Sequence, residues 1–518
     1  MLLKELIVVI AISLPIFHFA KRVAPMFSAP KDFVRRRNIW LALTVAAFTL
    51  PNFWWFTLFA GPLLIWGSRT DSNPIAFYLS LMLVIPSVPV EIPTIVFNRL
   101  FMLDSYRLLS LCVLVPAARR LWKLQRSVGR LGKIDMLLLG YGLIQTVFFI
   151  RPDLSPHVSM EDSFTNILRR AFLFLLDAYV LYFVASRLCT SRRMIAEAMG
   201  AYCLSAALVA VTALFETTRH WLLYSDLTLR WAGEAASPFY TMRAELLRPQ
   251  ASTGGPLQLG YLLAVALGYW LYIRSIVNSR AFSIIVILLF CGALTVTLSR
   301  GPWVGAIVTV FTFAALGPRA LPRLIKSISV AAIASIAVFI SPLGARIMSV
   351  IPFIGTGGPS DTVTYRERLL SRSWELILQH PFFGDQFVLS KMTDLRQGQG
   401  IIDLVNTYAE VTLYYGVIGL AFFVSPIILA FLNAYTGARR TAHSNPDLSL
   451  LGASLAACII GTLVMLVSCS FIGGYAQMFY ILCGLGSSYR LLTTPFGSDR
   501  PLRSAFYKND PNRVPSKP

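Results

Sequence analysis

The arginine of a short motif, LSRGPW, is the residue in this chain best placed to do chemistry. Pro302 suits the first position of a helix, and Gly301 or Ser299 can serve as its cap, so the motif predicts a helix start. The free N–H groups and partial positive charge of a helix start, together with the planar guanidinium of Arg300, favour phosphate oxygens. The motif therefore predicts an anion site at the edge of a membrane. The alternative is an arginine snorkelling beside a small-residue packing pair, Gly301 and Gly305.

Two further basic elements could join this site. In segment 364–375, Arg366 is accompanied by two more arginines. Apolar residues recur at helical spacing from 369 to 377, which predicts an amphipathic helix along the membrane surface. These apolar residues are Leu369, Leu370, Leu376 and Ile377. The arginines either bind an anion or form a solvated face balanced by Glu367 and Glu375. Arg248, in a polar, Gly-rich loop before an apolar run, is a third candidate, weak by itself.

Acidic and amide side chains gather before another apolar run. Asp403, Asn406 and Glu410 recur at intervals of three and four residues, so we expect them on one face of a helix entering the membrane. Ionisable groups at that depth are costly and indicate function. The alternative is that Asp403 caps the helix and Glu410 lies at the interface.

The elements that position these residues are membrane helices. Of the 518 residues, 56% are hydrophobic and only 14% are charged, whereas charged residues make up about a quarter of ordinary globular chains. Several apolar runs reach about 20 residues, which is enough to cross a bilayer. The sequence therefore predicts an all-α, polytopic integral membrane protein in which residues 1–518 form a single membrane domain.

The distribution of charge predicts the orientation of these helices. Although the formal net charge is +21, the cations cluster in short loops, so we expect them to mark the cytoplasmic side rather than to bind nucleic acid. The two longest loops, 216–255 and 345–410, carry near-balanced charge and are predicted to be periplasmic, and the tail 493–518 is predicted to be cytoplasmic. These anchors give roughly 12 to 15 spans. Region 38–66 is predicted to form two short helices that meet near Pro51 and Asn52.

Signals for a metal or a cofactor are missing. The seven cysteines lie in or beside apolar runs, the five histidines are scattered without metal-ligand spacing, and no phosphate-binding or dinucleotide fingerprint occurs. We therefore expect no metal and no cofactor. The substrate must then supply its own energy.

The order of these motifs resembles the O-antigen ligase and Wzy-type polysaccharide polymerase family. An arginine-bearing loop precedes a span, Ser-Arg-Gly opens a helix, Arg366 stands ahead of the turn HPFFG at 380–384, and Asn406 stands ahead of GVIG at 416–419. The resemblance is clearest from about Arg248 to Leu420. The stretch GIIDLVN, residues 400–406, is most similar to polymerases of exopolysaccharide clusters.

The resemblance implies an inverting glycosyltransferase that needs no metal or nucleotide sugar. It moves a glycan from undecaprenyl diphosphate to an acceptor hydroxyl at the periplasmic face of the bacterial inner membrane. Its arginines steady the departing diphosphate. By position that role falls first to Arg300, then to Arg366 and Arg248, with Ser299 and Gly301 beside them.

One departure separates this chain from the ligases. They carry a histidine directly before the residue that matches Asn406, and this chain has Val405 there. A ligase acting on lipid A core is therefore disfavoured. If a base is needed, Asp403 is the nearest carboxylate and Glu410 the second choice.

The sequence thus predicts a repeat-unit polymerase of an exported polysaccharide. Its expected partners are an undecaprenyl-diphosphate-linked oligosaccharide, membrane lipids, a chain-length regulator and a flippase, with no nucleic acid. The alternatives are a ligase that uses another acceptor, and a flippase or other transporter. A transporter usually shows inverted repeats and polar residues at mid-span, whereas here polar groups collect in two loops and at helix ends.

Overall fold

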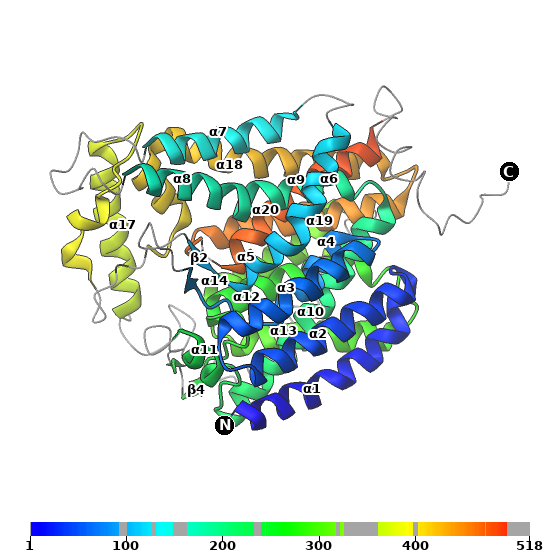
Figure 1. Ribbon diagram of the computed structural model, residues 1–518. Coiled ribbons are helices and arrows are strands. Elements are labelled where there is room, and N and C mark those ends of the chain that lie inside the picture. Colours follow the sequence, from blue (N-terminus) through cyan, green and yellow to red (C-terminus); the bar gives the residue numbers. More distant parts are fainter. Residues whose placement is uncertain are drawn as a thin grey trace.

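The molecule is a bundle of long helices with one amphipathic helix at its end (Figure 1). The computed structural model describes residues 2–92, 101–125, 131–148, 163–232, 240–243, 245–317, 322–325, 361–396, 402, 404–471 and 473–494. All statements about the structure refer to these residues.

The first half of the bundle contains ten described α-helices. They are α1 (Leu2–Val23), α2 (Pro30–Thr49), α3 (Phe53–Thr70), α4 (Pro74–Leu81), α5 (Ser105–Leu109), α6 (Val115–Gln125), α7 (Lys133–Phe148), α8 (Ser163–Phe174), α9 (Val180–Leu188) and α10 (Arg192–Arg219). Two π-helical segments, Ser110–Leu114 and Leu175–Tyr179, join α5 to α6 and α8 to α9 without a break in the helical path.

The second half carries the residues of the candidate site. Its helices are α11 (Ser225–Ala232), α12 (Pro256–Ile273), α13 (Arg280–Val296), α14 (Arg300–Leu316), α17 (Asp361–Gln379), α18 (Thr407–Thr441), α19 (Pro446–Leu466) and α20 (Gly474–Thr493). Short 3-10 helices cover Ala24–Met26, Val388–Lys391 and Thr393–Leu395. The strands form two small antiparallel hairpins, β1 (Val90–Glu91) with β2 (Met102–Leu103), and β3 (Met242–Arg243) with β4 (Leu246–Leu247).

These helices confirm the prediction of an all-α membrane protein. In the described part of the chain, six helical segments are long and apolar enough to cross a bilayer. They are Leu2–Met26, Leu168–Leu188, Arg192–Arg219, Pro256–Ile273, Thr407–Thr441 and Pro446–Leu466, and Arg280–Val296 and Arg300–Leu316 are shorter apolar helices. The count of 12 to 15 spans stays a prediction.

The break within region 38–66 falls where the sequence placed it. Helix α2 ends at Thr49 and α3 begins at Phe53. Asn52 caps α3, because its side-chain oxygen accepts hydrogen bonds from the backbone N–H groups of Trp54 and Trp55 at 3.1 and 3.0 Å. The prediction of two short helices is therefore confirmed.

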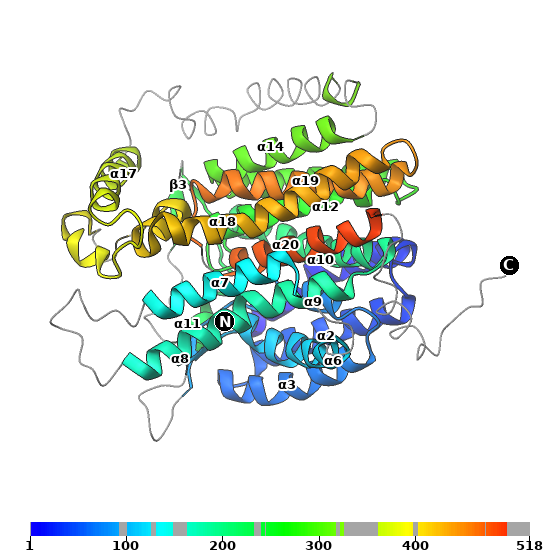
Figure 2. The same cartoon turned by 90° about the horizontal axis from the view of Figure 1, so that it is seen from above.

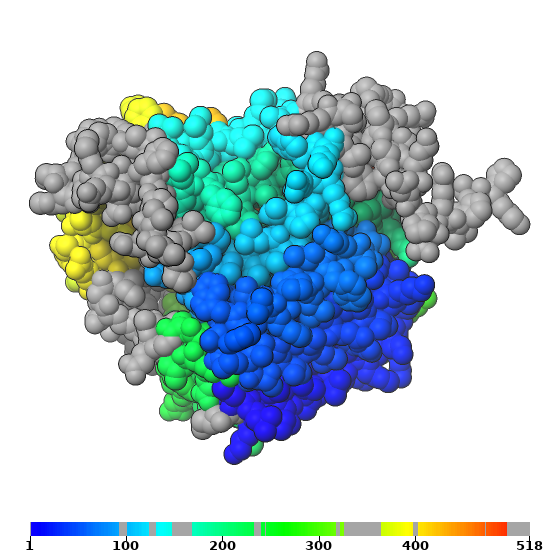
Figure 3. Space-filling model, viewed as in Figure 1, coloured from blue at the N-terminus to red at the C-terminus, as the bar shows by residue number. Residues whose placement is uncertain are grey.

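The outer surface is apolar, as expected of a protein whose solvent is lipid. The N-terminal helices cover much of one face (Figure 3), and on α3 Trp55, Leu58 and Trp66 are more than half exposed. Inside the bundle, α12, α14 and α19 approach closely through small residues. A side chain at Gly461 would overlap Thr309, and one at Gly268 would overlap Cys458.

Helix α17 stands apart from the membrane bundle. Figures 1 and 2 show it at one end, beside the start of α18, against which it packs. A separate small core of apolar side chains lies beneath it. That core consists of Leu369, Leu376, Val388, Met392, Leu395, Leu404 and Leu413. The end of the bundle that carries α17 also carries the candidate site.

Candidate functional site

A β-hairpin holds two arginines over the turn between α13 and α14. Arg243 lies on β3 opposite Leu246, and the backbone N–H of Arg248, just past β4, donates to the carbonyl of Thr241 at 3.0 Å. Glu245, in the hairpin turn, adopts a positive φ of 62°. The hairpin thus projects both arginines from one short, hydrogen-bonded unit.

The two guanidinium groups bind the turn that leads into Arg300. Arg248 donates from Nε to the Thr297 carbonyl at 3.0 Å and from Nη2 to the Ser299 hydroxyl at 2.8 Å. Arg243 donates from Nη1 to the Leu298 carbonyl at 3.0 Å. Carbonyls at the end of a helix lack intrahelical partners, and cations stabilise them. Both arginines therefore fix the turn, and each retains further N–H groups for an anion.

The positive charges of four arginines act on one another at this site. The pKa of Arg243 is lowered by burial and then by the charges of Arg300 and Arg366. Burial, followed by the charge of Arg243, lowers the pKa of Arg248 to about 10. The cluster is therefore a concentrated positive field that an anion would stabilise. We call Arg243, Arg248, Arg300 and Arg366 the arginine cradle.

A small pocket adjoins the cradle. It has a volume of about 170 Å³ and lies between α17, the segment before α18, and the residues that follow α19. Arg366 and Ser373 line it from α17, Asn406 from the second segment, and Ser468 from the third. A side chain at Gly301 would overlap the Ser468 hydroxyl, so the start of α14 abuts the same pocket.

Asn406 caps α18. Its side-chain oxygen accepts from the backbone N–H groups of Tyr408 and Ala409 at 3.0 and 3.2 Å, and Thr407 is the first helical residue. Because the oxygen is engaged, the amide nitrogen is the group that can donate to a ligand. The expectation of Asp403, Asn406 and Glu410 on one helix face is therefore wrong, since residues 404–406 are not helical. Asp403 itself lies outside the described residues.

Glu410 lies one turn into α18. It is half-buried, and its backbone N–H donates to the carbonyl of Asn406 at 2.9 Å. Val405, Asn406 and Ala409 line the small pocket, but Glu410 does not. The structure thus brings Asn406 beside Arg366 and leaves Glu410 further along the helix.

Two motifs that the sequence could not connect interlock at the base of α17. Gly416 interrupts α18 with φ 66° and ψ −172°, a conformation essentially restricted to glycine. The interruption leaves the N–H of Val417 to donate to the Pro381 carbonyl at 2.9 Å. A side chain at Gly416 would overlap the backbone of Phe382.

The reciprocal half of this interlock comes from the turn after α17. The backbone N–H of Asp385 donates to the carbonyl of Leu413 at 2.7 Å. Gly384 has φ 65°, and a side chain there would lie 2.5 Å from the backbone carbon of Tyr414. The HPFFG and GVIG motifs are thus a backbone lock that fixes α17, and with it Arg366, to α18.

An ion pair reinforces the lock. The Asp385 carboxylate is 2.6 Å from Nζ of Lys391 and accepts from the backbone N–H of Phe387 at 2.9 Å. Burial alone would raise the pKa of Asp385. The hydrogen bonds from Lys391 and Phe387 outweigh it and hold that pKa below its ordinary value.

The LSRGPW motif starts a helix, as predicted, but in a different register. Arg300 is the first residue of α14 and Pro302 the third, so the placement of Pro302 at the first position is wrong. Proline is tolerated there because N–H groups of the first turn have no intrahelical partner. Ser299 occupies the cap position, yet its hydroxyl donates to the Thr297 carbonyl at 3.1 Å instead of capping. Gly301 serves close packing.

The arginines of α17 were predicted either to bind an anion or to form a solvated face, and the structure contains an example of each environment. Arg372 pairs with Glu375 at 2.8 Å, which fits a solvated, balanced face. Arg366 instead lines the pocket. Leu369 is buried, whereas Leu370 and Trp374 are 59% and 62% exposed, so the helix has a second apolar face that is open to a membrane surface.

Sequence reasoning missed two residues of this site. Arg243 stands five residues before Arg248 in the same polar loop, and its spacing carried no signal until the hairpin folded it back. Ser468 follows an apolar run with nothing in the sequence to connect it to Gly301. The hairpin and the packing of α14 on α19 bring both residues to the cradle.

Comparison with known proteins gives one family. Residues 284–424 match a family model described as O-Antigen ligase. The match spans Arg300, Arg366, Asn406 and the interlocked glycines, while the hairpin with Arg243 and Arg248 precedes it. No curated protein matches the chain.

Proposed function

We propose that the chain is a repeat-unit polymerase of an exported polysaccharide, and the match of residues 284–424 to the O-antigen ligase family model supports this. This match supports membrane glycosyl transfer in general. The proposed donor is an undecaprenyl-diphosphate-linked glycan, and the proposed acceptor is a hydroxyl of the next lipid-linked repeat unit. The proposed site faces the periplasm from the bacterial inner membrane.

The arginine cradle is the observation that carries this proposal. In the reaction the acceptor oxygen attacks the anomeric carbon from the face opposite the diphosphate, which inverts that carbon. The bond from this carbon to the phosphate oxygen breaks, its electron pair stays on the diphosphate, and the acceptor releases a proton. Charge therefore grows on the leaving group, and donors already fixed around it lower the barrier. Arg243 and Arg248 are held by the turn, and Arg366 by the lock.

Val405 supports a polymerase over a ligase. It lines the small pocket beside Asn406, at the position where the ligases of this family carry histidine. An aliphatic side chain cannot accept a proton, so the acceptor hydroxyl needs another group or none. Asp403 and Glu410 remain the proposed candidates for that group.

The position of the polar groups supports an enzyme over a transporter. The arginines lie on the β3–β4 hairpin, at the start of α14 and on α17, a helix with an exposed apolar face, as suits a lipid-anchored donor that stays in the membrane. A flippase and a chain-length regulator are then proposed as partners that deliver and measure the polymer.

Replacing Arg300 by lysine tests the proposed role of the cradle. The change keeps the charge but removes the planar pair of donors, so we expect polymer formation to fall about ten- to a hundredfold, the loss of one charge-assisted hydrogen bond or more. The assay is polymer formation by purified protein from lipid-linked repeat units. Arg372→Lys, on the exposed face of α17, is the matched control and should retain activity.

Other outcomes would redirect the proposal. Full polymer from both Arg300→Lys and Arg300→Ala would reduce Arg300 to a snorkelling side chain. Movement of the lipid-linked unit across vesicles by the wild type, with no new glycosidic bond, would favour a transporter.

A further inference from the structure

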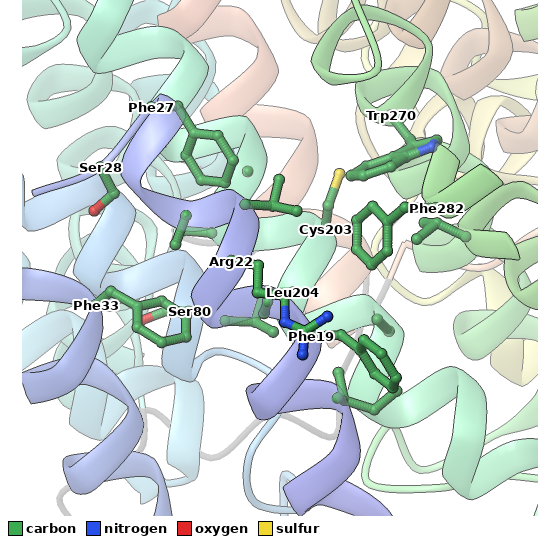
Figure 4. Close-up of a pocket in the computed structure, with 18 of the residues that line it drawn as sticks. Phe19, Arg22, Phe27, Ser28, Phe33, Ser80, Cys203, Leu204, Trp270 and Phe282 are labelled. Atoms are coloured by element: carbon green, nitrogen blue, oxygen red, sulfur yellow. The ribbon is translucent and has the colours of Figure 1, made fainter. Parts of the chain in front are cut away.

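An apolar groove lies on the flank of the bundle, between α1, α10 and α13 (Figure 4). It has a volume of about 430 Å³, within the usual range of ligand pockets, roughly 300–1,000 Å³. Aromatic and aliphatic side chains dominate its lining, among them Phe19, Phe27, Phe33, Leu204, Trp270 and Phe282. Such a lining accepts hydrocarbon and disfavours unpaired polar groups.

The groove lies at the opposite end of the bundle from the arginine cradle. Helix α12 starts at Pro256, shortly after Arg248, and ends at Ile273. Trp270, in its last turn, lines the groove. Since the helix has 18 residues, its ends are about 27 Å apart, close to the thickness of a bilayer core. The groove therefore opens near the other membrane face.

Small residues on α10 leave the space between its neighbours open. Helices α1 and α13 both pack against α10, and Gly200, Ala201 and Ala207 line the groove between them. A side chain at Gly200 would overlap Phe27. The groove is thus a gap between α1 and α13, which both pack against α10.

One cation without a carboxylate partner, Arg22, lines the groove. Its interactions are with His18, at 3.3 Å between Nη2 and Nε2, and with the ring of Phe19. Lys21 and Arg280 do not line the groove but are the sequence neighbours of the lining residues Arg22 and Ser279. Within the described part of the chain, no carboxylate pairs with Arg22, Lys21 or Arg280, all of which are exposed.

The buried arginine beneath the groove differs sharply from Arg22. Arg36 also lines the groove, but it is 2.6 Å from Asp71 and 2.9 Å from Glu197. This inner cluster is compensated within the protein and stabilises the packing of α2 on its neighbours. Of the two arginines that line the groove in the described part of the chain, Arg22 is the one without a carboxylate partner.

We propose that the groove binds one anionic glycerophospholipid, with an acyl chain along the apolar lining and the headgroup phosphate on Arg22. An arginine fork and a phosphate form paired, charge-assisted hydrogen bonds, while the chain replaces bilayer contacts with protein contacts. Lys21 and Arg280 add attraction for the negative headgroup. The site is separate from the donor site and does not depend on the proposed polymerase reaction.

Photo-crosslinking of the full chain in nanodiscs tests this site. The probe is phosphatidylglycerol with a diazirine in one acyl chain, compared with phosphatidylcholine that carries the same chains. We expect phosphatidylglycerol adducts to concentrate on peptides of α1, α10 and α13. Arg22→Gln should reduce the preference for phosphatidylglycerol about fivefold, which is the usual effect of one cation beside an anionic lipid.

Two filling variants and one charge control complete the experiment. Leu204→Trp should reduce adducts of both lipids in the groove, and the smaller change Ala207→Leu serves if the tryptophan variant does not fold. Arg440→Gln removes an exposed arginine from the end of α18, away from the groove, and should leave the adduct pattern unchanged.

Three results would overturn the proposal. Adducts could be equally abundant for both lipids in the wild type, or spread evenly over other outward helices such as α3. Alternatively, a polyprenyl phosphate could displace the probe at lower concentration than unlabelled phosphatidylglycerol, which would make the groove a second carrier-lipid site.

Discussion

Replacing Gly416 by alanine should unlock α17 while leaving the membrane bundle folded. The residue has φ 66° and ψ −172°, where a side chain is strained by about 1–3 kcal/mol. A Cβ atom would also overlap backbone atoms of Phe382 and Phe383, which cannot rotate away as a flexible side chain can.

The size of the effect follows from the contacts that must separate. Relief of the overlap moves the turn away from α18 and breaks the hydrogen bonds Val417 to Pro381, at 2.9 Å, and Asp385 to Leu413, at 2.7 Å. Each is worth about 0.5–1.5 kcal/mol net, so with the strain the lock loses about 2–6 kcal/mol. Even the lower value shifts the equilibrium of the lock about 30-fold toward the open form.

Opening the lock should separate Arg366 from the rest of the cradle. We expect polymer formation to fall at least tenfold and limited proteolysis between 361 and 396 to accelerate, at near-normal protein yield. Gly292→Ala is the matched control, because its new Cβ would lie 3.9 Å from Leu214, an ordinary contact, and alanine favours a helix. Wild-type polymer and wild-type protease resistance from Gly416→Ala would refute this account.

Three further predictions concern the cap, the ion pair and the orientation. Asn406→Asp keeps the oxygen that caps α18 but removes the amide donor and adds negative charge near the cradle. Thermal stability should therefore hold while polymer formation falls about tenfold or more. Asn406→Ala should also lose about 1 kcal/mol of stability, because it removes the cap. Because the folded-state pKa of Asp385 is lowered, its stabilising effect is present above the ordinary aspartate value near 4 and is lost as pH falls through the lower value. Protease resistance of 361–396 should thus be constant from about pH 8 to 5 and drop only in stronger acid, and Asp385→Asn should abolish that drop. For the orientation, a cysteine at exposed Ser390 should react with an impermeant reagent in intact cells and one at Gln125 should not; the reverse pattern would invert the topology.

The sequence by itself determined the class of the protein and most of its candidate residues. Long apolar runs can be accommodated only by lipid, because a soluble fold of this length could not bury them. The break at Asn52 was also readable, since a capping side chain acts on N–H groups only two and three residues away. Arg300, Arg366 and Arg248 could be identified as candidates because an arginine next to an apolar run is recognisable in the sequence.

Only the tertiary structure decided which of these residues meet. Arg243 enters the cradle through a two-residue pairing of β3 with β4, and Ser468 through the packing of α14 on α19. Helix α18 starts at Thr407, later than the predicted helix that included Asp403, because Asn406 supplies the cap. Gly416 and Pro381, 35 residues apart in the sequence, form one lock because a broken helix frees backbone N–H groups that a distant turn accepts. Such contacts depend on backbone positions in space, which residue types and their spacing do not encode.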